Sequence, residues 1–160
     1  MRRLILLLAT LGVFAVLGHA VWDAETLIAR GETVLLRLAP RDPRSLMQGD
    51  YMALRWELER DAPAAPAGAS RAIVAVDADG VASFRRIDGG EALAADERRF
   101  AVRIDGEGRR PMVEPHSFLF QEGRAKAFEA AKFGIFRLAA DGRHRLVGLA
   151  DAERRPIDPK

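Results

Sequence analysis

The feature that most constrains this chain is an apolar run over residues 4–22, which contains no formally charged side chain. At about 1.5 Å of rise per residue, a helix of this length spans close to the ~30 Å hydrocarbon thickness of a bilayer. Residues 1–22 are therefore predicted to form an N-terminal membrane anchor or signal segment.

The charges that flank this run predict its orientation. Arg2 and Arg3 precede it, and Asp23 and Glu25 follow it. Because positive charge is retained on the cytoplasmic side, the N-terminus is expected in the cytoplasm and everything after Trp22 outside.

A cleaved signal peptide is the alternative. The segment Gly18-His19-Ala20 places small residues at positions −3 and −1 of a cleavage site. The apolar run continues past that site to Trp22, so an uncleaved anchor is preferred. His19 is expected near the membrane boundary, where its ring reaches the headgroups. Either alternative places the following domain in the same extracytoplasmic compartment.

Composition excludes several classes of function. Without Arg2 and Arg3 the chain has equal numbers of basic and acidic side chains, which cannot build the field that nucleic acid requires. Cysteine is absent, which excludes disulfides and thiol chemistry, and the three histidines show no metal-ligand spacing. No metal and no cofactor are predicted.

The rest of the chain is divided into a connector over residues 23–32, a β-rich domain over 33–151 and a polar tail over 152–160. Strict alternation of apolar and polar residues predicts a strand over 52–58. The expected fold is mainly β with one short helix (α+β), a compact antiparallel β-sandwich or barrel-like domain after an N-terminal transmembrane helix.

Turn residues and a change of period place the other elements. Asp77–Gly80 and Asp141-Gly142 predict hairpins, as does the glycine-rich turn Asp105–Gly108. Residues 123–133 read as a helix that ends at Gly134. The predicted core is Val34, Leu36, Leu38, Met52, Leu54, Trp56, Leu58, Val102, Phe118 and Phe120.

One motif resembles a known family. The segment Gly49-Asp50-Tyr51-Met52-Ala53-Leu54-Arg55-Trp56 follows Asp42-Pro43-Arg44-Ser45-Leu46, and Phe118-Leu119-Phe120-Gln121-Glu122-Gly123 lies farther on. Together they resemble the GDYXXLXY family of small bacterial membrane-anchored proteins, with Trp56 in place of the final tyrosine. The resemblance implies an inner-membrane location with a periplasmic domain, and a multi-pass membrane protein as partner. It implies no reaction.

Physical arguments divide the motif residues into two groups. Asp42, Pro43, Gly49, Leu54, Trp56 and Gly123 are predicted to be structural, because they fit turns or a buried strand face. Arg44, Asp50, Tyr51 and Glu122 are predicted to gather at one edge of the β-structure as an interaction or ligand cluster, with Arg44 paired to a carboxylate. A structural role for each of these four residues is the alternative.

No catalytic residue is assigned, although an enzyme stays open. Ser45 resembles no activated nucleophile, because no lysine occurs before Lys126 to act as its base. The expected function is an accessory or interaction domain that works with a multi-pass membrane protein. The alternatives are a small-ligand or cell-envelope binding domain and an unrecognised envelope hydrolase, for which Asp50 and Glu122 are the candidate carboxylates.

Overall fold

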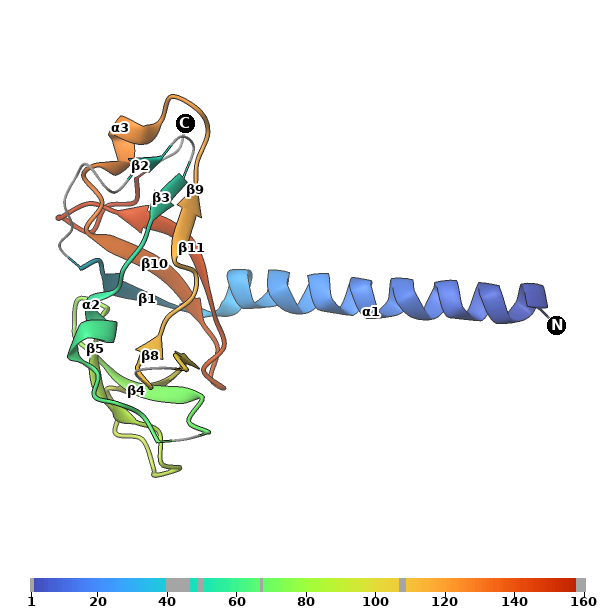
Figure 1. Ribbon diagram of the computed structural model, residues 1–160, viewed down its shortest axis with the longest axis horizontal. Helices are drawn as coiled ribbons and strands as arrows, with labels where there is room; N and C mark the ends of the chain where they lie inside the picture. The colour runs from blue at the N-terminus through green and yellow to red at the C-terminus, as the bar shows by residue number, and fades with distance from the viewer. Residues whose placement is uncertain (1, 40–46, 49–50, 67, 107–108, 158–160) are drawn as a thin grey trace.

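The computed structural model describes residues 2–39, 47–48, 51–66, 68–106 and 109–157. Its helices are α1 (Arg2–Arg30), α2 (Glu57–Asp61) and α3 (Ala125–Phe128). The strands, shown in Figure 1, are β1 (Glu32–Arg37), β2 (Met47–Gln48), β3 (Tyr51–Ala53), β4 (Arg71–Val76), β5 (Val81–Ile87), β6 (Glu97–Ala101), β7 (Arg103–Ile104), β8 (Pro111–Met112), β9 (Ser117–Leu119), β10 (Phe133–Leu138) and β11 (His144–Ala150).

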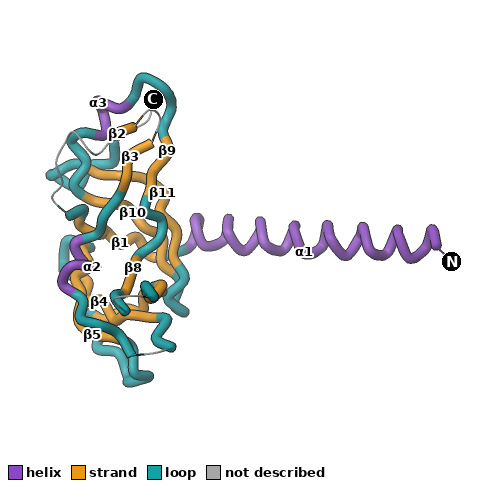
Figure 2. The backbone as a smooth tube through the Cα atoms, in the orientation of Figure 1, coloured by secondary structure: helices purple, strands orange, loops and turns teal. Residues whose placement is uncertain are grey.

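The apolar run forms a single helix that stands away from the β-rich domain (Figures 1 and 2). Within the described residues, α1 is the one helix long and apolar enough to cross a membrane, and its apolar window is fully exposed. A signal-anchor and a signal sequence both fit this helix. The helix continues beyond Trp22 to Arg30, so most of the segment expected as a connector is helical.

Six strands form the main sheet in the order β11-β10-β1-β5-β4-β6. The predicted mainly-β class is confirmed, but the sheet is mixed, because β1 pairs parallel with β5 and antiparallel with β10. β1 lies between two separate hairpins, β4–β5 and β10–β11, and no turn joins it directly to either. β11 and β6 are edge strands of the described sheet, which is therefore not a closed barrel.

Two predicted hairpins are confirmed, since local hydrogen bonds define their turns. The Asp77 carboxylate accepts hydrogen bonds from the N–H groups of Asp79 and Val81, and Gly80 adopts a φ of +77°. Asp141 similarly accepts the Arg143 N–H between β10 and β11. The third predicted hairpin is reduced to the short β7–β8 pair, because β6 pairs with β4 and β9 pairs with β3.

The strand predicted over residues 52–58 is wrong in its second half. β3 ends at Ala53, Trp56 forms an isolated bridge with Leu38, and α2 begins at Glu57. Met52, Leu54, Trp56 and Leu58 are all buried nevertheless. Extended backbone leads to Trp56 and the first turn of α2 then turns Leu58 inward, so alternating burial arises without a continuous strand.

The helix predicted over residues 123–133 is also wrong in extent, since α3 covers only Ala125–Phe128. Gly134 does not end it and lies instead inside β10. The Trp56 ring explains this glycine, because a Cβ at position 134 would lie 2.5 Å from Trp56 Cη2 and 2.6 Å from Cζ3. The predicted core is otherwise confirmed, with Leu38, Phe118 and Phe120 partly buried against it.

Two glycines of neighbouring strands provide a matched test of this contact. We expect Gly134→Ala to lower the free energy of unfolding by about 1–3 kcal/mol, because the added methyl group overlaps the indole. Gly148→Ala should cost little, since its Cβ would meet only Ile135 Cδ1 at 3.7 Å. Urea unfolding of the detergent-solubilised protein measures both. Equal stability of the two variants would contradict the packing described for Trp56.

Candidate functional site

Residues Tyr51–Ala53 of the family-like motif form β3, the central strand of a small three-stranded sheet with the order β2-β3-β9. Met52 pairs with Phe118 on the core side, whereas Tyr51 stands opposite Leu119. Tyr51 is 39% exposed and Leu119 is 76% exposed. We call these two residues the Tyr51–Leu119 pair. One side of this sheet thus packs on the core, while the other presents an aromatic and an aliphatic side chain to solvent.

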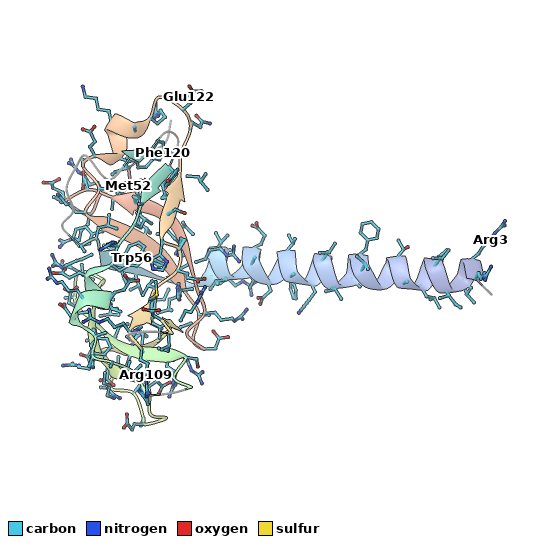
Figure 3. All side chains as sticks on the ribbon, viewed as in Figure 1. Arg3, Met52, Trp56, Arg109, Phe120 and Glu122 are labelled. Carbon is cyan, nitrogen blue, oxygen red and sulfur yellow. The ribbon has the colours of Figure 1, made fainter. Side chains whose placement is uncertain are left out.

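Two of the four predicted cluster residues can be placed. Tyr51 lies in β3, and Glu122 lies exposed in the turn three residues beyond Leu119. Figure 3 shows Met52, Phe120 and Glu122 at the same end of the domain. Arg44 and Asp50 lie outside the described residues, as do Asp42, Pro43 and Gly49. The four-residue cluster and the pairing of Arg44 therefore stay predictions.

The motif ends on Trp56, which organises the neighbouring chain segments. Its side chain is 1% exposed, and its Nε1 donates to the carbonyl oxygens of Val113 at 3.0 Å and Pro115 at 3.2 Å. The Phe136 ring meets the indole edge-on, with 5.0 Å between ring centroids. Leu54 and Trp56 thus supply core packing, and Trp56 also satisfies two carbonyls of the segment that leads into β9.

A groove of about 640 Å³ lies beside Trp56 and α2. Leu54, Trp56 and Met112 are among its apolar lining residues, and Arg55, Arg110 and His116 are among its polar ones. We call it the motif groove. The Glu59 carboxylate fixes its edge, accepting hydrogen bonds from the Val113 N–H at 2.7 Å and His116 Nε2 at 3.1 Å. His116 therefore has a structural partner within the domain.

Two cationic residues of the motif groove are available to a ligand. Within the described part of the chain, the guanidinium groups of Arg55 and Arg110 have no hydrogen bond, ion pair or ring contact. Sequence reasoning missed both residues. The alternating pattern over residues 52–58 places Arg55 among the polar positions of a strand, and nothing local to Arg110 indicates that it lines a groove with a residue more than 50 positions earlier.

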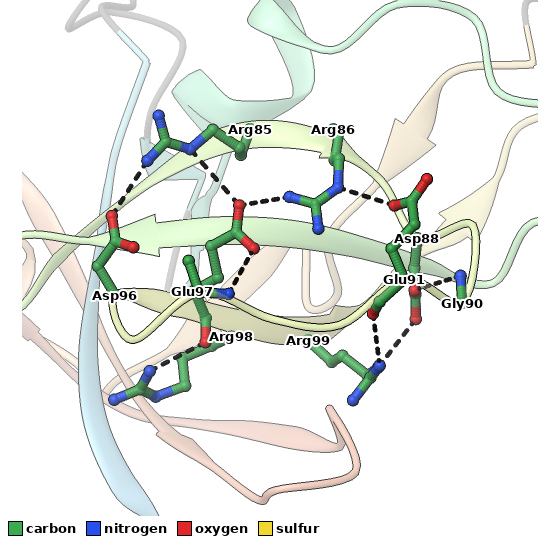
Figure 4. Close-up of polar contacts among 10 residues, drawn as sticks. Arg85, Arg86, Asp88, Gly90, Glu91, Asp96, Glu97, Arg98 and Arg99 are labelled. Atoms are coloured by element: carbon green, nitrogen blue, oxygen red, sulfur yellow. Dashed lines mark hydrogen bonds and ion pairs between the residues drawn. The ribbon is translucent and has the colours of Figure 1, made fainter.

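A denser polar cluster connects β5, β6 and the loop between them, and its charged groups pair with one another (Figure 4). The buried Glu97 carboxylate accepts hydrogen bonds from Arg86 and from the Ala94 N–H. These bonds, with Arg86 the stronger influence, hold the pKa of Glu97 below its ordinary value. The Gly90 N–H, followed by Arg99, similarly lowers the pKa of Asp88. We interpret this cluster as structural.

The described residues contain no group of three or more His, Asp or Glu side chains that could hold a metal ion. The Tyr51–Leu119 pair offers exposed apolar surface, and the motif groove combines two guanidinium groups with the apolar side chains of Leu54, Trp56 and Met112.

Comparison with known proteins gives one match. The family model described as GDYXXLXY protein matches residues 13–149, which begin within α1 and end in β11. No curated protein and no solved structure matches the chain. The matched region contains the β2-β3-β9 sheet, Trp56 and the motif groove.

The internal cluster predicts how stability depends on pH. The folded-state pKa of Glu97 lies below its unfolded value, so its contribution is present above the unfolded pKa, about 4.3, and is lost as pH falls through the folded pKa. Glu97→Gln should therefore destabilise the protein at pH 7, and the difference from wild type should shrink in acid. The exposed Glu91, which also bonds Arg86, provides the control Glu91→Gln, with a small effect expected. Urea midpoints between pH 3 and 7 measure this, and parallel profiles for wild type and Glu97→Gln would contradict it.

Proposed function

The chain belongs to the GDYXXLXY protein family, and from this premise we propose that it is a membrane-anchored extracytoplasmic accessory domain that works with a multi-pass membrane protein. In this proposal α1 remains uncleaved, crosses the bacterial inner membrane once and carries the β-rich domain on the periplasmic side. No reaction is assigned to the protein. It recognises its partner through side chains that the core does not use.

The shape of the molecule supports an anchored domain. Leucine, isoleucine, valine and phenylalanine side chains of α1 are exposed, and their burial in lipid would remove them from water. β9 and β11 lie on the side of the domain from which α1 leaves (Figure 1). If α1 spans the membrane, this side of the domain faces the bilayer and any integral membrane partner within it.

The Tyr51–Leu119 pair is the observation that carries the proposal. Leu119 is the most exposed of the large apolar side chains identified as exposed beyond α1, and Tyr51 stands directly across the ladder from it. Covering exposed apolar side chains lowers the free energy of a complex, and tyrosine is enriched in protein interfaces. A partner that covers Leu119 would therefore also contact the exposed part of the Tyr51 ring.

Site-specific cross-linking tests the proposal. We expect a photoreactive phenylalanine derivative in place of Leu119 to form an adduct with one multi-pass protein in native membranes, because β9 lies at the contact. The same derivative in place of Arg60, an exposed residue of α2 on the side of the domain away from α1 (Figure 1), should form little of that adduct. Mass spectrometry identifies the partner and shows whether residues 1–22 are retained. A folded, membrane-inserted protein that forms no adduct specific to position 119 would contradict the proposal.

The motif groove favours a second candidate function, the binding of a small anionic ligand. Arg55 and Arg110 come from distant segments, yet both line the groove without an acidic partner in the described residues. Guanidinium groups match the geometry of carboxylates and phosphates, and Trp56, Leu54 and Met112 would accommodate an apolar portion.

Titration calorimetry with pyrophosphate and citrate tests this second function. We expect saturable binding that weakens about tenfold in Arg55→Gln or Arg110→Gln, since one charge-assisted hydrogen bond is lost in each. Lys126→Gln, which removes an exposed cation of α3, provides a control outside the motif groove. Absence of binding to both anions, or equal binding by all variants, would contradict a ligand role for the groove.

A further inference from the structure

A second cavity, of about 630 Å³, lies where α1 joins the β-rich domain. Asp23 and Leu27 line it from the helix. The domain contributes Arg103 from β7, Arg143 from the β10–β11 turn and Arg145 from β11. Met112 and Leu146 add apolar surface. We call this space the junction cavity.

The sequence determines the depth of the junction cavity relative to a bilayer. The uncharged run ends at Trp22, and Asp23 is the first charged side chain after it. If α1 spans a bilayer, Asp23 lies at the level of the lipid headgroups. The cavity would then lie at the same level, because Asp23 and Leu27 line it. Arg143 pairs with Asp23 and holds the helix against the domain at this point.

A second contact keeps the helix end and the sheet together. Arg137 of β10 donates hydrogen bonds to the Gly31 carbonyl at 3.3 Å and to Thr33 Oγ1 at 2.6 Å. Since Gly31 directly follows α1, the sheet is fixed to the end of the helix. The arginines of the junction cavity are therefore held near the membrane surface.

The three arginines of the junction cavity differ in how firmly their charges are paired with acidic side chains. Arg143 is occupied by Asp23 and Asp141. Arg103 pairs with Glu114 at 3.0 Å, but both side chains are exposed, and such surface pairs exchange readily for another acceptor. Among the described residues, the Arg145 guanidinium has no hydrogen bond, ion pair or ring contact.

His144, which also lines the cavity, adds no positive charge at neutral pH. Its ring stacks on Phe100 with 3.9 Å between centroids, and its ring nitrogens face the carbonyls of Gly142 and Glu114. Burial lowers its pKa below the ordinary value. The positive charge of the junction cavity thus comes from arginine.

We propose that the junction cavity binds the headgroup phosphate of an anionic phospholipid, with Arg145 as its principal ligand and Arg103 as the second. Both guanidinium groups can donate to phosphate oxygens, and Leu27, Met112 and Leu146 would contact the glycerol and the first acyl carbons. The proposal rests on α1 being an uncleaved span, as in the proposed function. It adds a lipid specificity that anchoring alone does not require.

Native mass spectrometry of the full chain tests the proposal. The protein is extracted from bilayers of equal parts phosphatidylcholine and phosphatidylglycerol, and retained lipids are counted. We expect wild type to retain one phosphatidylglycerol in preference to phosphatidylcholine, and Arg145→Gln to reduce that retention about tenfold, since a charged donor is lost. Arg145→Lys should restore part of it, and Arg55→Gln, which removes another unpaired arginine, should retain lipid as wild type does. Unchanged thermal melting would show that Arg145→Gln is folded.

The outcomes separate this proposal from the anchor itself. An intact chain that retains both lipids equally, or an Arg145→Gln variant that retains phosphatidylglycerol as wild type does, would overturn the lipid site and leave the anchor standing. A mature chain that begins at Val21 would overturn both, and the same spectra would show it directly in the protein mass.

Discussion

The position of the Trp56 indole is the constraint on which the rest of the domain depends. The ring fits against β10 only because Gly134 has no side chain, and its Nε1 ties the segment at Val113 and Pro115 to the same point. Three segments that are far apart in the chain are therefore fixed by one residue. The tyrosine that closes the family's pattern is replaced here by another flat ring with a polar hydrogen, so its burial still leaves a donor to be satisfied.

The parts of the fold that sequence predicts well are those that local chemistry determines. Asp77 and Gly80 close their hairpin with bonds inside the turn, so nothing distant is needed to recognise it. Gly134 shows the opposite case. Its place after an apparently helical segment predicted a helix end, whereas a ring more than 70 residues earlier in the chain requires the glycine. Alternating burial was likewise predicted correctly, but the short strand and helix that produce it were not.

The same distinction applies to the candidate sites. Tyr51 is adjacent to the buried Met52 in β3, so its side chain lies on the opposite face of the strand, and it is 39% exposed. Leu119 belongs to the family-like motif, but its exposure could not be predicted from sequence, because it depends on the pairing of β9 with β3. The motif groove was missed entirely, since it forms only when the segments that carry Arg55 and Arg110 meet. Arg44 and Asp50 lie outside the described residues.

The described arginines differ in whether their guanidinium groups have a partner within the chain. In the β-rich domain most of the described guanidinium groups bond carboxylates or backbone carbonyls, and those of the β5–β6 cluster connect β5 and the loop after it with β6, across the intervening strand β4. Arg55, Arg110 and Arg145 have no such contact in the described residues, and each lines a cavity.

The two cavities differ in position. α2, which borders the motif groove, lies on the far side of the domain from α1, while the junction cavity lies against the helix (Figure 1). A domain anchored through α1 would therefore present Arg145 to lipid and leave Arg55 and Arg110 accessible from the periplasm. Partner docking at the Tyr51–Leu119 pair would use residues that line neither cavity, whereas lipid contact and ligand binding would share the Met112 side chain, which lines both.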